Sequence, residues 1–193
     1  MKNYLRLVLL SLLLVCFRTH QVSGEERKGT ISMGFQYQYS LMGGVSEYAD
    51  NYDGGIGYGI KLKYYLGKKK AIGISFENQY HDATLEPATV DDPGRLQFNT
   101  TTVEFFRYFE RNKPVSRYVV IGAGLCQPTV LWSAGGPERT EDGPIVTAGA
   151  GTEFFISRSI AVDFRLKGST FVNDDGLTAA GFFSVGFAYY VVN

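Results

Sequence analysis

The sequence is poor in cysteine, proline and long hydrophobic runs. It has two cysteines, Cys16 and Cys126, and six prolines among 193 residues. Cys16 lies in the N-terminal apolar segment, so loss of that segment would leave Cys126 alone and exclude an intrachain disulfide. Beyond the N-terminus, no stretch reaches the ~20 apolar residues that a membrane-spanning helix needs. A mature chain of this sequence could enter a membrane only as a closed barrel of strands.

Histidine is scarce too, and neither sign of charge is in excess. The chain has 19 basic and 19 acidic residues and two histidines, of which only His81 lies beyond residue 24. This balance creates no strong field for nucleic acid. The ligand spacing of a metal site is missing, and the glycines at 122–124 and 149–151 lack the rest of a dinucleotide fingerprint. The sequence predicts no metal, no cofactor and no nucleic-acid partner.

Residues 1–24 are typical of a secretory signal peptide. Lys2 and Arg6 form a positive start, an apolar run follows, and the small residues before Glu25 suit cleavage there. The apolar run is too short to span a membrane as a helix. Lipid attachment at Cys16 is the alternative interpretation. We therefore expect a mature domain of residues 25–193, which suits one domain.

The mature sequence alternates between apolar and small or polar residues. Near the end, Phe183, Val185 and Phe187 share one parity, while Ser184 and Gly186 share the other. Successive side chains of a strand point to opposite faces, so this alternation predicts strands with one apolar face. Glycine, tyrosine and phenylalanine are abundant, at 23, 13 and 14 residues, and aromatic residues favour strands. Eight strands are predicted: 30–40, 56–66, 71–81, 95–110, 117–125, 144–157, 160–172 and 178–193.

The connections between these strands alternate in length. Long segments follow the first, third and fifth strands, and short turns follow the second, fourth and sixth. Long external loops and short periplasmic turns are the pattern of outer-membrane barrels. The parity of the strand from Arg95 to Glu110 is ambiguous, and a β-bulge near Thr101 or Thr102 would explain it. We expect the last strand to close an up-and-down barrel against the first.

Charged residues occupy the face opposite the apolar one. Burying these charges unpaired in a soluble core would be costly. If the charged face met water instead, the many glycines on it would only weaken the strands. The sequence therefore favours a narrow lumen with internal ion pairs and an apolar, lipid-facing exterior, with aromatic girdles near the strand ends. An eight-stranded barrel is just wide enough for its own side chains to fill, so no open pore is expected. The predicted lumenal ion-pair cluster comprises Lys61, Lys63, Glu77, Glu153, Asp163, Arg165 and Lys167.

The chain resembles the small outer-membrane β-barrel superfamily, the OmpA/OmpX-like eight-stranded proteins. The resemblance covers essentially the whole mature chain and rests on the signal peptide, the run P-V-S-R-Y-V-V-I-G-A-G-L at 114–125 and the terminal F-S-V-G-F-A-Y-Y at 183–190. It implies location in the outer membrane of a Gram-negative-type bacterium, contact with membrane lipid, and insertion by the barrel-assembly machinery. Members commonly end in an aromatic residue; this chain ends Tyr190-Val-Val-Asn, a departure from the insertion signal.

Three functional hypotheses follow. The first is a non-catalytic, monomeric barrel with a structural or adhesive role, contacting a host or surface ligand through loop residues Tyr48, Tyr52 and Trp132. The second is a barrel enzyme acting on lipid A or peptide with His81 and Asp82, although these neighbours should point to opposite faces. The third is a secreted, soluble β-barrel or sandwich that binds an apolar ligand with its apolar faces inward.

Overall fold

A computed structural model describes residues 28–46, 52–83, 93–109, 114–132, 136–173 and 176–191. The predicted signal segment, with its proposed cleavage before Glu25, lies outside these residues. The described chain is built of strands. Their bounds are β1 Ile31–Ser46, β2 Tyr52–Gly67, β3 Lys70–Ala83, β4 Pro93–Tyr108, β5 Val115–Trp132, β6 Pro137–Arg139, β7 Gly143–Phe155, β8 Ile160–Asn173 and β9 Gly176–Val191.

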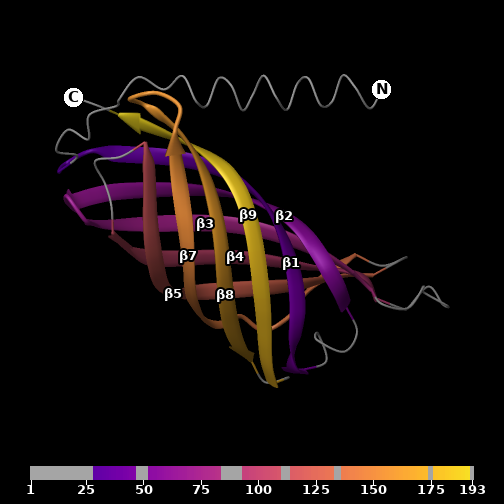
Figure 1. Cartoon of the computed structure of the whole chain (residues 1–193). Helices are drawn as coiled ribbons and strands as arrows, with labels where there is room; N and C mark the ends of the chain where they lie inside the picture. Colours follow the sequence, from indigo (N-terminus) through magenta and orange to yellow (C-terminus); the bar gives the residue numbers. More distant parts are fainter. Residues whose placement is uncertain are drawn as a thin grey trace, which may run out of the picture.

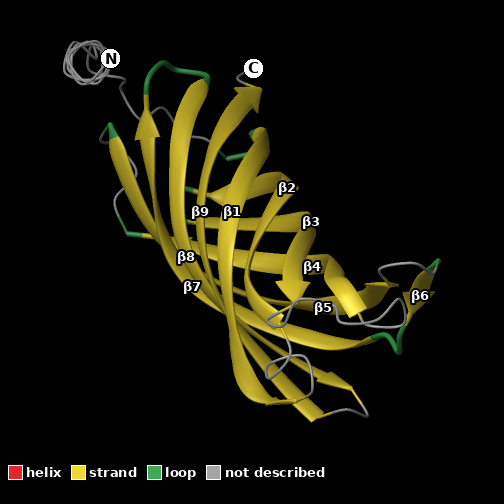
Figure 2. Ribbon diagram, turned by 90° about the vertical axis from the view of Figure 1, so that its right-hand side faces the viewer, coloured by secondary structure: helices red, strands yellow, loops and turns green. Residues whose placement is uncertain are grey.

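Eight long strands form a closed antiparallel barrel, as the alternation predicts. Each pairs with its neighbours along the chain, β5 pairs with both β4 and β7, and β9 pairs with β1. The last ladder runs from Ile31 opposite Val191 to Ser46 opposite Gly176, and Figure 1 shows β1 and β9 side by side. Short β6 pairs only with the end of β5 (Figure 2). The final strand therefore closes the barrel against the first.

The strands are strongly inclined to the barrel axis. Following the paired residues once around the ring leads from Gly34 on β1 through every long strand and back to Gly44. Such a stagger requires tilted strands, as in small barrels generally. We call one end of the barrel the loop end, with connections 47–51, 84–92, 133–142 and 174–175, and the other the turn end, with connections 68–69, 109–114 and 156–159.

The predicted strands differ from the structure in several details, among them the fifth strand, which continues to Trp132 instead of ending at Leu125. The ladders of β4 with β3 and β5 run without a shift from Arg95 to Tyr108, so no bulge occurs at Thr101 or Thr102. The parity is confusing because the inward face of β4 is apolar at both ends and polar in its middle. The first loop is also shorter than expected, since β1 continues to Ser46 and β2 begins at Tyr52.

The exposure of the side chains is the reverse of that in a soluble protein. Phe35, Ile121 and Leu166 on the outer surface are 55%, 62% and 64% exposed, whereas Lys61 and Arg165 are 3% and 2% exposed. Outward aromatic residues include Tyr37, Tyr39, Tyr64, Phe154 and Tyr189. The apolar parity therefore faces outward and the charges face inward, which contradicts the hypothesis of a soluble barrel with an apolar interior.

The interior has three layers along the barrel axis. An apolar cluster, which includes Leu96, Phe98 and Phe171, fills the loop end. An aromatic cluster, which includes Tyr65, Phe106 and Tyr190, fills the turn end. Charged and polar side chains lie between these two clusters. Among the residues that the structure describes, no helix is long and apolar enough to cross a membrane.

Candidate functional site: the lumenal ion network and the loop end

Arg165 of β8 is the centre of a buried ion network. Its Nη1 donates to both carboxylate oxygens of Glu104 on β4, at 2.9 and 3.1 Å. Its Nη2 donates to Glu77 Oε1 on β3 and to Gln36 Oε1 on β1, each at 2.9 Å. Lys167 Nζ donates to the second oxygen of Glu77 at 2.5 Å. One guanidinium thus ties together four strands from around the barrel.

A second group of ion pairs lies closer to the turn end. Lys61 Nζ lies 2.8 Å from Asp163 Oδ2, and Tyr118 donates its hydroxyl to the other oxygen of Asp163 at 2.7 Å. Lys63 pairs with Glu153, which also accepts hydrogen bonds from two tyrosine hydroxyls, those of Tyr108 and Tyr190. Charged carboxylates are satisfied here by both ammonium groups and phenols, as buried charges require.

The network is electrically balanced. Four cations meet four carboxylates, and every member has at least one oppositely charged partner within the barrel. Their side chains are between 0% and 8% exposed. The members are Lys61, Lys63, Arg165 and Lys167 with Glu77, Glu104, Glu153 and Asp163.

Glycines on the inward face leave room for these long side chains. A Cβ atom added to Gly151 would lie 2.4 Å from the Tyr118 ring, and one at Gly59 would lie 3.0 Å from Glu77 Cγ. A side chain at either position would displace a member of the network or a side chain bonded to it. The inward glycines that the sequence places beside the charges therefore have a steric reason.

All seven predicted lumenal residues lie inside the barrel, and sequence reasoning missed an eighth. Glu104 is fully buried and holds Arg165, and Ser75 donates to it at 2.8 Å. Its position could have been found only with the register of β4, because the apolar Phe106 and Tyr108 lie on the same inward face and hide the alternation. Gln36, which bridges Arg165 and Glu77, carries no charge to mark it.

The predicted loop contacts have separate outcomes. Tyr48 lies outside the described residues. The prediction that Tyr52 is a surface contact is wrong. A register shift between Tyr52 and Gly55 turns its ring into the apolar cluster of the loop end, where it is buried. Trp132, at the end of β5, is half-buried and donates its indole N–H to Glu138 at 2.8 Å.

His81 and Asp82 occupy opposite sides of the wall. His81 is fully buried, with its Nε2 atom 3.2 Å from Ser40 Oγ and its ring edge-on to Phe98. Asp82 faces outward and forms an exposed ion pair with Arg95 at 2.8 Å. The structure therefore does not bring the two groups together. Among the described residues, no group of three or more His, Cys, Asp or Glu side chains could hold a metal ion.

The connections at the two ends of the barrel differ in charge. Those of the loop end contain ten acidic residues and one basic residue, Arg139; those of the turn end contain five basic residues and one acidic residue, Glu110. A hydrogen bond to Asp142 raises the pKa of Arg139. The acids are Glu47, Asp50, Glu86, Asp91, Asp92, Glu138, Glu141, Asp142, Asp174 and Asp175, and the bases are Lys68, Lys69, Arg111, Lys113 and Arg158.

Comparison with known proteins agrees with this architecture. The family model described as "Outer membrane protein beta-barrel domain" matches residues 7–190. No curated protein matches the sequence. Among solved structures, Neisserial surface protein A is similar over 84% of this chain and 99% of its own, with 11% identity and a TM-score of 0.65.

Two further solved structures are similar. Ail, the attachment invasion locus protein of Yersinia pestis, covers 85% of this chain and 99% of its own in a complex with the heparin analogue sucrose octasulfate, at 21% identity and a TM-score of 0.58. OprG from Pseudomonas aeruginosa covers 89% and 100%, at 10% identity and a TM-score of 0.56. At these identities the likeness concerns the fold.

Proposed function

Because the chain belongs to the outer membrane protein beta-barrel domain family, we propose that it is a non-catalytic barrel, closed by its own side chains, that makes surface contacts through its acidic loop end. The fold and the family place it in the outer membrane of a Gram-negative bacterium. In the proposed orientation the loop end, with the longer connections, lies outside the cell and the turn end lies in the periplasm, as is usual for outer-membrane barrels. The closed lumen and the surface contact are separate parts of the proposal, and each has its own test.

The balanced ion network carries the proposal of a closed lumen. Arg165 reaches partners on β1, β3 and β4, so its side chain and theirs cross the interior. Packed aromatic and apolar clusters lie on either side of the network. An interior cavity beside Phe98 and Phe171 measures about 20 Å³, about enough for one water molecule. A hydrated ion would have to break buried ion pairs to pass.

Conductance measurements test the closed lumen. The purified protein, folded into a planar bilayer, should show no steady ion current. The triple variant Arg165→Ala, Glu77→Ala and Glu104→Ala removes the central side chains together. Of the charges that pair with these three residues, only that of Lys167 remains. This variant should produce measurable conductance. A steady current through the wild-type protein, comparable with that of the triple variant, would contradict a closed lumen.

The charge of the loop end supports a basic surface ligand. Its described extension, β6 and the residues after it, carries Glu138, Glu141 and Asp142 against Arg139. Surface potential steers oppositely charged partners and repels those of like charge. Ail was solved with a sulfated, polyanionic ligand; the acidic loop end of this chain favours the opposite sign.

Binding of model polyelectrolytes tests the sign of that ligand. Protein in neutral nanodiscs should bind polylysine at its loop end, with binding that weakens as salt rises. Because a nanodisc also exposes the basic turn end, binding of heparin is compared before and after that end is neutralised. Neutralising Glu138, Glu141 and Asp142 to Gln, Gln and Asn should weaken polylysine binding, whereas Lys68→Gln at the turn end should not. Binding to heparin in place of polylysine would refute the proposed preference.

The absence of catalysis rests on the separation of His81 from Asp82. A general base needs its partner within hydrogen-bond reach, and here the barrel wall lies between them. Assays on lipid A and on peptides should show equal, background rates for the wild-type protein and for His81→Ala. A rate that depends on His81 would establish the enzyme hypothesis in place of this one.

A further inference from the structure

A groove runs along the lipid-facing surface of β7 in the turn-end half of the barrel. Its volume is about 450 Å³. The outward side chains of β7 there, Ala150 and Thr152, are small, whereas Val119 on β5 and Phe164 and Leu166 on β8 are larger. The wall is therefore hollowed along one strand and bordered by bulkier apolar side chains on the neighbouring strands.

Arg117 lies at the turn-end side of this groove. It is the third residue of β5, is exposed, and is paired with Thr152 of β7. Arg107 of β4 lies beside it: Arg107 is opposite Val119, so it is the diagonal neighbour of Arg117 on the same outward face. Diagonal neighbours of this kind are ~7–8 Å apart. Two arginines on neighbouring strands thus share one part of the outward face.

Neither arginine has an acidic partner among the described residues. No ion pair joins Arg107 or Arg117 to any carboxylate in that part of the chain. A charge on the lipid-facing surface is unfavourable unless it reaches the interface. Both residues lie close to the ends of their strands, beside Phe109, which is 55% exposed. Their side chains can therefore reach the headgroup region of the periplasmic leaflet.

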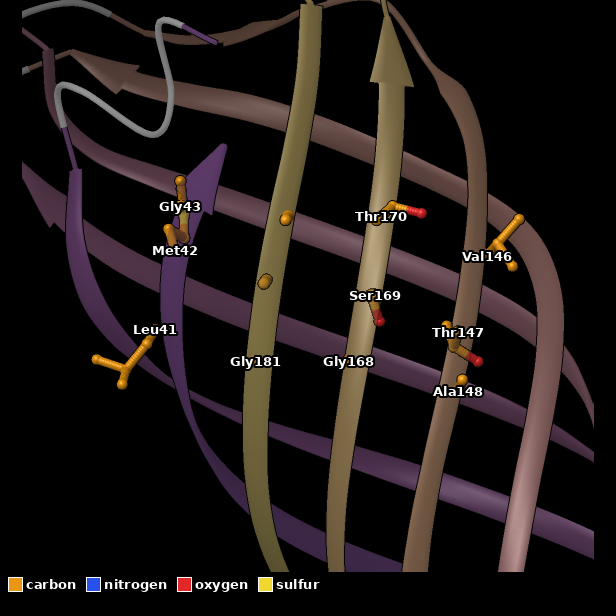
Figure 3. A pocket seen from close by; sticks show the side chains of 12 residues that line it. Leu41, Met42, Gly43, Val146, Thr147, Ala148, Gly168, Ser169, Thr170 and Gly181 are labelled. Carbon is orange, nitrogen blue, oxygen red and sulfur yellow. The ribbon is translucent and has the colours of Figure 1, made fainter. Parts of the chain in front are cut away.

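A second groove on the outer surface provides the contrast. It measures about 610 Å³ and lies over β1, β7, β8 and β9, nearer the loop end. Figure 3 shows its lining, in which Gly43, Gly168 and Gly181 leave backbone bare between Leu41 and Val146. It has no charged side chain, so nothing in it selects one lipid over another. The arginines distinguish the groove on β7.

We propose that the groove along β7 binds one acyl chain of a phospholipid whose phosphate contacts Arg117 and Arg107. The arrangement matches the shape of such a lipid: the phosphate lies at the interface and the chain runs along Thr152 and Ala150 toward the middle of the membrane. The basic connections of the turn end add a favourable field for the headgroup. Bidentate contact with phosphate oxygens is what arginine geometry suits.

Native mass spectrometry of the mature chain in detergent tests the site. Titration with dioleoyl phosphatidylglycerol should give one tightly retained lipid, whereas dioleoylglycerol, which has the same chains and no phosphate, should not be retained. Inorganic phosphate alone should not bind at the same concentrations. Equal retention of dioleoylglycerol, or equal binding of inorganic phosphate, would overturn the proposal of a phospholipid site.

Two double variants distinguish binding at the groove from the general electrostatic attraction of the basic turn end. Arg107→Gln with Arg117→Gln should weaken retention roughly thirtyfold, if each arginine contributes what a basic residue near a lipid surface does. Lys68→Gln with Lys69→Gln removes the same charge at the same end, outside the groove, and should change retention by much less. Equal losses in the two double variants would show a surface field without a site.

Filling the groove tests the acyl chain independently of charge. Ala150→Leu keeps both arginines and adds an apolar side chain to a lipid-facing position, so the barrel should fold as before. Retention of phosphatidylglycerol should fall about tenfold, because the added side chain occupies the path of the chain. Unchanged retention by Ala150→Leu would refute the acyl-chain part of the proposal.

Discussion

The ion pairs Lys61–Asp163 and Arg95–Asp82 have the same nitrogen-to-oxygen distance, 2.8 Å. The first lies inside the barrel, with side chains 3% and 8% exposed; the second lies on the outer surface toward the loop end, with side chains 51% and 73% exposed. The attraction between two charges grows as the local dielectric constant falls. Two ion pairs with the same distance therefore contribute unequally to the stability of the barrel, because the contribution depends on the surroundings of each pair.

The cost of removing one partner differs even more between the two pairs. In the interior, removal of Lys61 would leave Asp163 a buried charge that keeps the hydrogen bond from the Tyr118 hydroxyl but has no cation in ion-pair contact among the described residues. At the outer surface, water and salt ions would replace the missing partner of Asp82. The interior pairs constrain which side chains can fill the lumen together. The outer pair places little constraint on which side chains can occupy the positions around it.

Lys61→Met should give the largest effect, lowering the free energy of unfolding by roughly 3–5 kcal/mol, as breaking a buried ion pair generally does. The methionine keeps a comparable volume, so the loss is that of the charge. Urea-dependent unfolding from lipid vesicles, followed by tryptophan fluorescence and by heat-dependent gel mobility, measures the change.

The double variant Lys61→Met with Asp163→Asn is the matched control. Replacing both partners leaves no buried net charge, and an asparagine can still accept the hydrogen bond from Tyr118. Most of the stability should therefore return. If the double variant were as unstable as Lys61→Met alone, the loss would come from packing and the comparison between the two pairs would fail.

The barrel itself could be predicted because alternation is a local property of the sequence. Phe183, Val185 and Phe187 against Ser184 and Gly186 already separate the two faces, and a period of two residues survives whatever the neighbouring strands do. The direction of the faces followed from chemistry, because Glu153, Asp163 and Arg165 could not be buried in a dry core unpaired. The β-strands and the direction of their faces therefore depend on features that a single strand displays.

The partners inside the lumen could not be predicted, because they depend on register between strands far apart in sequence. Glu104 pairs with Arg165 across the barrel, and its strand gave no clear parity. The inward turn of Tyr52 depends on an irregularity in its pairing with β3. The groove on β7 likewise appears only when the neighbouring strands are placed beside it.

Leu166→Arg tests the other side of the comparison, an unpaired charge on the outer wall. Leu166 is 64% exposed on β8, next in sequence to the buried pair-forming Arg165 and Lys167. An arginine facing lipid should destabilise the barrel by roughly 2–4 kcal/mol near the middle of the membrane, and by less near an interface. Leu166→Met, which keeps the surface apolar, is the control and should unfold within about 1.5 kcal/mol of the wild type.

Asp82→Asn should have the smallest effect, because it breaks the exposed pair. Measured contributions of such pairs are ~0.2–1 kcal/mol, and salt screens them. The same urea titrations, run at low and at high salt, should therefore show a small loss for Asp82→Asn that vanishes at high salt, while the loss for Lys61→Met persists. Arg95 also lies over the Tyr80 ring, so its own removal would mix two interactions, and Asp82 is the cleaner site. A loss for Asp82→Asn as large as that for Lys61→Met, and insensitive to salt, would mean that the outer surface near Arg95 is shielded from water, against its exposure in the structure.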